Sequence, residues 1–246
     1  MIYKKEASLD QVLDQQLYYH HFQPIFCMGT NRPHGYECLL RSLYAHNPQE
    51  LFQKAILSKK LFELDLSSIV LAIDLINQHA KKFTPDTKFY LNIYPSTLAS
   101  PAFLILLKEM IAASPFNADN FILEINENEI VHHIDALRYA VERLQSIGVQ
   151  IALDDIGADM GHLDTMLKVH PNTIKLDKYF ADDLANSPSK QQQLKLLKRF
   201  CRKRNIKIVL EGIENDADLQ AALQCGIPLI QGFLLGRPAE LHHFLN

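Results

Sequence analysis

The chain of 246 residues carries a formal net charge of −3, and 48% of its residues are hydrophobic. The near-neutral charge excludes a global attraction to nucleic acid or to anionic membranes, and the ordinary composition excludes a disordered chain. The length fits two small domains or one α/β barrel, and the order of the elements favours a single domain over residues 1–246.

Four cysteines, at positions 27, 38, 201 and 225, show no CxxC spacing, and we expect them to be reduced and buried. The amino-terminal residues lack the apolar run of a secretory signal. The best apolar stretch, residues 67–76, is short and is interrupted by Asp74. We therefore expect a cytoplasmic protein that does not insert into a membrane.

Eight segments rich in β-branched and aromatic residues predict strands, and segments with helical spacing of apolar residues lie between most of them. The helical segments include residues 48–80, expected to form two helices, residues 130–148, and residues 215–226, which begin with a good cap. The expected strands cover residues 20–28, 35–42, 88–95, 120–127, 149–156, 173–180, 206–214 and 228–236.

The connection between the first two strands decides the topology. Eight strands that alternate with helices predict a closed barrel of parallel strands. Only seven residues, Met28 to His34, lie between Cys27 and Gly35, and a parallel crossover needs a dozen or more. We therefore predict an α/β fold, a TIM-like (β/α)8 barrel with an antiparallel first strand.

The basic run from Lys195 to Arg204 carries six Lys or Arg residues. Its apolar positions, Leu194, Leu197, Phe200 and Cys201, have helical spacing and are predicted to face the barrel. Cations near the carboxyl end of a helix are stabilised by the helix dipole, so we expect no nucleic-acid polymer as a partner.

Polar side chains recur within or just after seven of the eight predicted strands. For the parallel strands this is the carboxyl-terminal side, where barrel enzymes build their sites. A single acid or amide at a strand end often only caps the next helix. Polar residues at the same end of seven strands instead indicate a shared ligand. These residues are Glu37, Asn92, Glu124, Asp154, Asp155, Lys175, Asp177, Glu211 and Gln231.

The set is rich in hard oxygen donors, and no His or Cys occupies a matching strand end. The donors considered as metal ligands are the amide of Asn92 and the five carboxylates of Glu37, Glu124, Asp154, Asp155 and Glu211. These donors suit Mg²⁺ or Mn²⁺ better than zinc or copper. The set is large for one magnesium, so we expect two ions roughly 3.5–4 Å apart, as in phosphate-ester hydrolases. The adjacent Asp154 and Asp155, which would otherwise repel each other, would bind or bridge the two ions.

Lys175 lies two residues before Asp177, on the same face of a strand. Two nearby cations would lower the pKa of Lys175, so that it could orient or help to deprotonate an attacking water. A structural salt bridge with Asp177 or Asp155 is a nearly equal alternative from the spacing alone.

Eight short motifs occur in order along the chain: "FQPIF", "GYECLLRS", "YLNIYPSTL", "LEINENEI", "ALDDIG", "IKLDKYF", "VLEGIEN" and "QGFLLGRP". Together they resemble the EAL domain, the bacterial cyclic di-GMP phosphodiesterase family, with Cys38 in place of the alanine of the Glu-Ala-Leu signature. The resemblance implies the barrel with an antiparallel first strand. It also implies hydrolysis of one phosphodiester bond of cyclic di-GMP, which gives the linear dinucleotide pGpG.

The resemblance implies a role for each matching residue. Lys175 would act on the nucleophilic water, Glu127 would steady the loop after Asp155, and Gln231 would support the water and the metal shell. Arg41 would contact a phosphate, and Gln23, Asp177 and Glu214 would complete the substrate contacts. The metal ligands would be Glu37, Asn92, Glu124, Asp154, Asp155 and Glu211, with Glu37 and Glu211 also counted as catalytic.

The partners and cofactors implied by the resemblance are cyclic di-GMP, two Mg²⁺ or Mn²⁺ ions per site and a second copy in a homodimer, with Ca²⁺ expected to inhibit. The chain departs from the family at Tyr94, where a small Ser is usual, and in the loop after Asp155. There Asp159 replaces a Gly, Met160 a Tyr, and Gly161 and His162 two Ser residues.

In the family this loop couples metal binding to dimerisation. The altered loop therefore supports a second hypothesis, a non-catalytic or weakly active EAL module that binds cyclic di-GMP or a partner protein as a sensor. The intact set of acids favours the enzyme.

Overall fold

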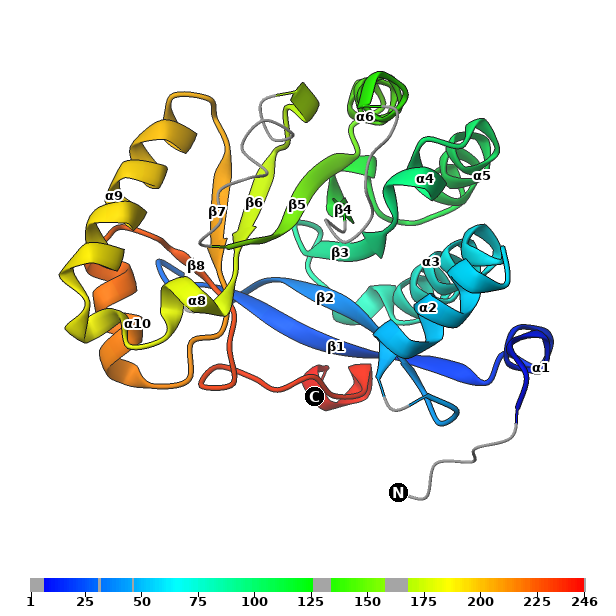
Figure 1. Cartoon of the computed structure of the whole chain (residues 1–246), viewed down its shortest axis with the longest axis horizontal. Coiled ribbons are helices and arrows are strands. Elements are labelled where there is room, and N and C mark those ends of the chain that lie inside the picture. Colours follow the sequence, from blue (N-terminus) through cyan, green and yellow to red (C-terminus); the bar gives the residue numbers. More distant parts are fainter. Residues whose placement is uncertain (1–6, 31, 46, 126–133, 158–167, 246) are drawn as a thin grey trace.

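The computed structural model describes residues 7–30, 32–45, 47–125, 134–157 and 168–245. Within them eight strands close into one barrel in the order β1-β2-β3-β4-β5-β6-β7-β8 (Figure 1). Strand β1 is antiparallel to both of its neighbours, β2 and β8, and the other neighbouring strands are parallel. The predicted barrel with a reversed first strand is confirmed. The strands are β1 Tyr18–Cys27, β2 Arg32–Ser42, β3 Lys88–Ile93, β4 Phe121–Ile125, β5 Gln150–Ile156, β6 Thr173–Leu176, β7 Lys207–Leu210 and β8 Leu229–Ile230.

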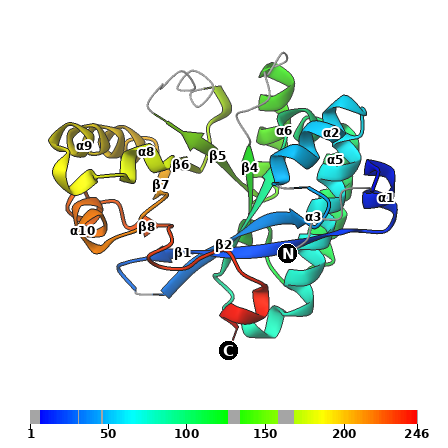
Figure 2. The ribbon, with the colours of Figure 1, turned by 60° about the horizontal axis from the view of Figure 1, so that its bottom comes forward.

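Helices pack around the outside of the barrel (Figures 1 and 2). The α-helices are α1 Leu9–Asp14, α2 Pro48–Leu57, α3 Leu61–Gln78, α4 Pro95–Leu98, α5 Pro101–Ala112, α6 Ile134–Ser146, α8 Lys178–Ala181, α9 Pro188–Arg202 and α10 Asp216–Gln224. The 3-10 helices are η1 Ala80–Lys82, η2 Ala118–Asn120, η3 Leu184–Asn186 and η4 Leu241–Phe244. Among the described helices, none is long and apolar enough to cross a bilayer.

The helical predictions agree with the structure where they can be compared. Residues 48–80 contain the two expected helices, α2 and α3. The side chain of Asn215 caps α10 by accepting a hydrogen bond of 2.9 Å from the Asp218 amide. On α9, the apolar positions Leu194, Leu197 and Cys201 are buried, as their helical spacing predicts, and Phe200 is half-buried. All four cysteines are free, and Cys38, Cys201 and Cys225 are buried as expected, whereas Cys27 is half-buried.

The alternation of side chains along each strand divides the core into two parts. On β4, Phe121, Leu123 and Ile125 join the core between the barrel and the helices. Ile122 joins a smaller cluster with Ile25, Tyr90, Ala152, Val209 and Leu229. This second cluster fills the barrel interior, because its members are the residues that alternate with the helix-facing positions. It forms an apolar layer beneath the carboxyl ends of the strands.

Several predicted strands are longer than the observed ones at their carboxyl ends. Strand β6 ends at Leu176, and Asp177 then caps α8 through the Tyr179 amide at 2.8 Å. Strand β8 ends at Ile230, because the chain turns at Gly232. A Cβ atom at Gly232 would lie 2.0 Å from the Ile213 carbonyl oxygen, so only glycine permits this approach. Apolar composition alone did not distinguish these turns from strand.

Candidate metal site

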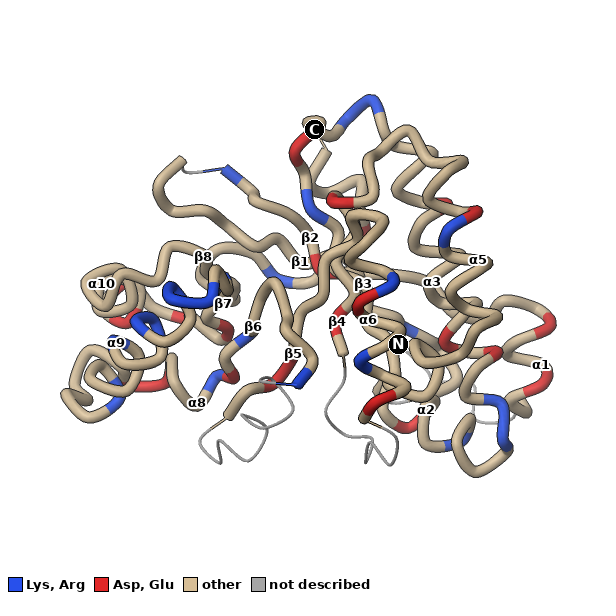
Figure 3. The backbone as a smooth tube through the Cα atoms, turned by 90° about the horizontal axis from the view of Figure 1, so that it is seen from above, with Lys and Arg blue, Asp and Glu red and all other residues tan. Residues whose placement is uncertain are grey.

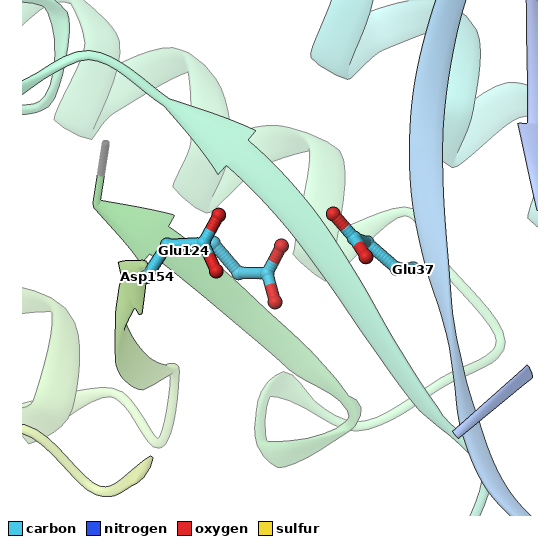
Figure 4. Close-up of side chains that lie close together, drawn as sticks. All are labelled: Glu37, Glu124 and Asp154. Carbon is cyan, nitrogen blue, oxygen red and sulfur yellow. The ribbon is translucent and has the colours of Figure 1, made fainter. Parts of the chain in front are cut away.

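The carboxyl ends of the strands carry a ring of polar side chains directed into the barrel. Figure 3 shows acidic segments on β4 and β5 and a basic segment on β6. In Figure 4 the carboxylates of Glu37, Glu124 and Asp154 project from three strands into the same space. The ring thus brings together groups that lie far apart in the sequence.

Lys175 lies at the centre of this ring, with only 1% of its side chain exposed. One ammonium carries three protons and cannot satisfy four carboxylates fully. Its Nζ atom lies 2.7 Å from Glu211 Oε1, 2.9 Å from Glu124 Oε1, 2.9 Å from Asp154 Oδ1 and 3.3 Å from Glu37 Oε2. Lys175 therefore holds the carboxylates together without neutralising them.

Two amides orient Glu37. Gln231 donates a hydrogen bond of 2.7 Å from Nε2 to Glu37 Oε2, and Asn92 donates one of 3.2 Å from Nδ2 to Oε1. Burial by itself would raise the pKa of Glu37, but Lys175 and these two hydrogen bonds outweigh it and lower the pKa. Glu37 is therefore held as a carboxylate in a fixed orientation.

The other acids differ from Glu37 because fewer donors face them. Burial raises the pKa of Glu124 well above its ordinary value, with Lys175 opposing the rise and Glu37 and Asp154 adding to it. Burial likewise raises the pKa of Glu211 to about 8, against the influence of Lys175. The site has more negative charge than its protein cation balances.

The pKa of Lys175 is affected by burial, which lowers it, and by the four carboxylates, which outweigh burial and raise it well above the ordinary value. The sequence predicts a lowered pKa for Lys175 beside two bound cations. Without metal ions the carboxylates raise it instead. The alternative pairing with Asp177 is not what the structure contains, since among the described residues Asp177 caps α8 and Lys175 pairs with Asp154 and three glutamates.

The backbone at Asp155 explains how two adjacent aspartates serve one site. Consecutive side chains of a regular strand point to opposite faces. Asp155 has φ of 53°, in the left-handed region, and the pairing of β5 with β6 shifts register between Leu153 and Ile156. One carboxylate oxygen from each of Asp154, Asp155 and Glu211 consequently lies within 4.8 Å of the others.

A second group of oxygens, from Glu37, Glu124 and Asp154, meets the same distance limit, so that Asp154 belongs to both groups. Glu124 Oε2 is buried and has no hydrogen-bond partner among the residues that the structure describes. A buried carboxylate oxygen without a partner, in a site with excess negative charge, is unfavourable. A hard divalent cation would bind this oxygen and offset the charge. The residues present therefore fit a hard divalent cation, and Asp154 could contribute a ligand in either group.

Two cavities meet at the carboxylates. The first, of about 430 Å³, is lined by Glu37, Asn92, Asp154, Asp155, Lys175 and Glu211, with Arg41, Phe52 and Tyr94 farther along its wall. The second, of about 320 Å³, is lined by Gln23, Glu37, Asp177, Glu211, Glu214, Gln231 and Phe233. Glu37 and Glu211 line both, so a ligand that extends into both cavities would contact the carboxylates at its middle.

Apart from Glu127, the remaining predicted site residues lie on these cavity walls. Arg41 donates a hydrogen bond of 2.8 Å to the Leu40 carbonyl, and Gln23 donates one of 3.2 Å to the Gly236 carbonyl. Glu214 pairs with Lys178 at 2.5 Å. Glu127 and residues 159–162 lie outside the described residues.

Sequence reasoning missed Asp65. This residue of α3 is 1% exposed, accepts a hydrogen bond of 2.8 Å from the Tyr94 amide and lines the first cavity. It thereby fixes the backbone beside an aromatic pair, Phe52 and Tyr94, whose ring centroids are 5.1 Å apart. The signal was available, because Asp65 and Ser68 lie at helical spacing within an otherwise apolar stripe.

The sequence model of the family described as "EAL domain" matches residues 6–238. The chain belongs to the EAL domain family. This finding confirms the resemblance, and the closed barrel with its reversed first strand agrees with it.

Among curated relatives, this EAL chain is 26% identical to the cyclic di-GMP phosphodiesterase PdeF of Escherichia coli K12. The 255 aligned residues cover 99% of this chain and 33% of PdeF, so the chain spans about a third of that relative's length.

Solved structures share the fold. BlrP1 of Klebsiella pneumoniae, in a calcium and cy-diGMP complex, superposes with a TM-score of 0.81 at 28% identity, over 92% of this chain and 56% of that one. The same protein also matches as a manganese and cy-diGMP complex. The MucR phosphodiesterase of Pseudomonas aeruginosa, in a c-di-GMP complex, has a TM-score of 0.85 at 23% identity, over 97% of this chain and 98% of that one, and shows the fold alone.

Proposed function

We propose that this EAL domain is a metal-dependent phosphodiesterase that hydrolyses cyclic di-GMP to pGpG. The observation that carries the proposal is the pair of carboxylate groups that share Asp154, one with Glu37 and Glu124 and one with Asp155 and Glu211. The names of PdeF and of the BlrP1 complexes support the substrate and the need for a divalent cation.

The carboxylates would hold two Mg²⁺ or Mn²⁺ ions, with Asn92 as an amide ligand. Bound there, the ions would supply Lewis-acid activation of the phosphodiester and of a water. Gln231 keeps Glu37 oriented, because its hydrogen bond fixes one oxygen of the carboxylate. We assign Lys175 to orienting the attacking water, since its ammonium contacts acids of both groups.

The two cavities suit a ligand with two purines around a central phosphate ring. Phe52 and Tyr94 on the first wall, and Phe233 on the second, offer aromatic faces for the bases. Arg41 in the first cavity supplies a cation for a phosphate. Gln23, Asp177 and Glu214 complete the second cavity. In the proposal Ca²⁺ inhibits, because it would bind the same oxygens without the same geometry.

The proposal also includes a homodimer in the cytoplasm and Glu127 as the residue that steadies the loop after Asp155. The second candidate function is a sensor module that binds cyclic di-GMP and leaves it intact. The altered sequence Asp159 to His162 is the observation that favours this candidate.

The deciding experiment incubates the protein with cyclic di-GMP and Mn²⁺ or Mg²⁺ and measures pGpG by chromatography. EDTA and Ca²⁺ form two further arms, and Glu37→Gln is compared with Glu142→Gln, which changes an exposed acid of α6. We expect pGpG only with Mn²⁺ or Mg²⁺, and only from the wild type and the Glu142 variant. Tight binding of cyclic di-GMP without any pGpG would contradict the enzyme and support the sensor.

A further inference from the structure

A cavity of about 630 Å³ lies at the end of the barrel opposite the carboxylates. Its lining includes Arg32 and His34 from the start of β2 and Thr87 from just before β3. Glu37 and Asn92 lie farther along these same strands, at the carboxyl-terminal side. The carboxyl-terminal helix η4, red in Figure 2, completes the wall with Phe244. A ligand here would not compete with a ligand at the metal site.

One wall of this cavity is aromatic. The ring centroid of Tyr36 lies 5.7 Å from that of Phe83 and 5.8 Å from that of Phe244. The three rings come from β2, the segment after η1, and η4, so separate parts of the chain build one apolar surface. Tilted and edge-on ring contacts of this kind leave faces and edges on which a further aromatic ring can pack.

The lining also contains polar and positively charged side chains. The cations Arg32 and Lys82 line the cavity together with one acid, Asp86. Thr30, Thr84 and Thr87 add hydroxyl groups. A cavity with an apolar side and a few converging polar groups is the usual form of a small-molecule site, and its volume lies within the range of roughly 300–1,000 Å³ that such sites occupy.

His34 supplies an independent observation. Its Nε2 atom is buried and has no hydrogen-bond partner among the described residues. Burial, together with Lys207 and Lys88, lowers the pKa of His34 to about 4, so the imidazole is neutral near pH 7. A neutral imidazole carries one donor and one acceptor, and a buried ring nitrogen left unbonded is costly. His34 therefore adds a neutral polar ring to the lining, and Arg32 and Lys82 carry its positive charge.

We propose that this cavity binds a small aromatic anion, a molecule with one ring and a carboxylate or phosphate group. The ring packs against Tyr36, Phe83 and Phe244, and the anion faces Arg32 and Lys82. Tight binding requires both the ring and the anionic group of the ligand. An inorganic anion would make no contact with the aromatic side chains, and a neutral ring would lack the attraction of the two cations.

The test uses phenyl phosphate and benzoate as probes. Inorganic phosphate, which lacks the ring, and phenol, which lacks the anionic group, are the controls. Binding is followed by isothermal titration calorimetry and by amide chemical shifts of the ¹⁵N-labelled full chain at pH 7.5. EDTA is present throughout, so that the carboxylates at the other end repel anions. The variant Arg32→Gln/Lys82→Gln changes two exposed cations and is expected to fold. Its matched control is Lys81→Gln, an exposed neighbour that does not line the cavity.

We expect saturable binding of phenyl phosphate or benzoate, with shifts at the amides of Thr84, Thr87 and Phe244. The double variant should bind the better probe at least about threefold more weakly, and Lys81→Gln should bind like the wild type. Phosphate and phenol should each bind more weakly than the combined probe. The proposal is overturned if neither aromatic anion binds, if the double variant and the Lys81 control are alike, or if inorganic phosphate binds as well as phenyl phosphate.

Discussion

Gln231, which follows β8, donates a 2.7 Å hydrogen bond to Glu37 of β2, although β1 lies between these two strands in the barrel. The same Nε2 atom lies 3.2 Å from Gln23 Oε1, so one amide links three strands or strand ends of the barrel. The position of a carboxylate at the candidate metal site therefore depends on a residue that follows the last strand.

Replacing Gln231 by Ala should weaken metal binding and turnover by roughly tenfold to a hundredfold, because groups that orient metal ligands commonly have effects of this size. Metal affinity is measured by calorimetry and turnover by release of pGpG. Gln53→Ala, at an exposed position of α2, is the matched control. Unchanged affinity and turnover in Gln231→Ala would show that this hydrogen bond does not support the site.

Replacing Lys175 by Met should destabilise the metal-free protein by about 3–5 kcal/mol, because the change leaves buried carboxylates without their cation. Turnover should be lost as well. Added Mn²⁺ should raise the melting temperature of this variant more than that of the wild type, since the ions replace the missing charge. Differential scanning fluorimetry with and without Mn²⁺ measures both effects. Lys178→Met, which changes an exposed lysine, is the control, and a Lys175 variant as stable as this control would contradict the prediction.

Mg²⁺ or Mn²⁺ should stabilise the wild type by mass action, by about 2.7 kcal/mol at a hundred times the dissociation constant. The double variant Asp154→Asn/Asp155→Asn should lose most of this stabilisation, because Asp154 belongs to both oxygen groups and Asp155 to one. Melting temperatures over a metal titration provide the measurement. Asp182→Asn/Asp183→Asn, which also changes two adjacent aspartates, is the control. Equal metal-induced shifts in the two double variants would mean that the ions bind elsewhere.

His20 should make the protein sensitive to acid. Its Nε2 atom lies 3.1 Å from Ser68 Oγ in a buried position, and burial together with Arg41 lowers its pKa from 6.5 to about 3. The unfolded chain then takes up the proton more readily than the folded one. The contribution of His20 to stability is complete above pH 6.5 and falls by up to about 1.4 kcal/mol per pH unit as the pH is lowered toward 3.

Urea unfolding of the wild type and of His20→Leu at pH 7.5, 5.5 and 4.5 tests this expectation. The loss of stability between pH 7.5 and 4.5 should be smaller in His20→Leu than in the wild type. His242→Leu, at an exposed histidine, should keep the wild-type dependence. A His20 variant with the same loss as the wild type would contradict the prediction, even if its stability at pH 7.5 were lower.

The barrel, and the placement of most polar groups at its carboxyl end, could be predicted from local sequence patterns. Strand periodicity decides which side chains point inward, and the short connection after Cys27 allows only an antiparallel first pair. Both constraints are local, so they can be read without knowing the neighbours of each strand. The same reasoning placed four site residues on strands, toward the carboxyl-terminal end of the barrel: Glu37, Asn92, Glu124 and Lys175.

Which of these groups lie in contact became known only from the folded barrel. Strand alternation alone would point Asp154 and Asp155 to opposite faces, and the left-handed backbone at Asp155 brings both to one site. Lys175 contacts four acids from four different strands or strand ends, an arrangement that exists only once the barrel closes. The turn at Gly232 likewise depends on the close approach of Ile213. Such pairings depend on distances between segments remote in sequence, and the local pattern of residues carries no information about those distances.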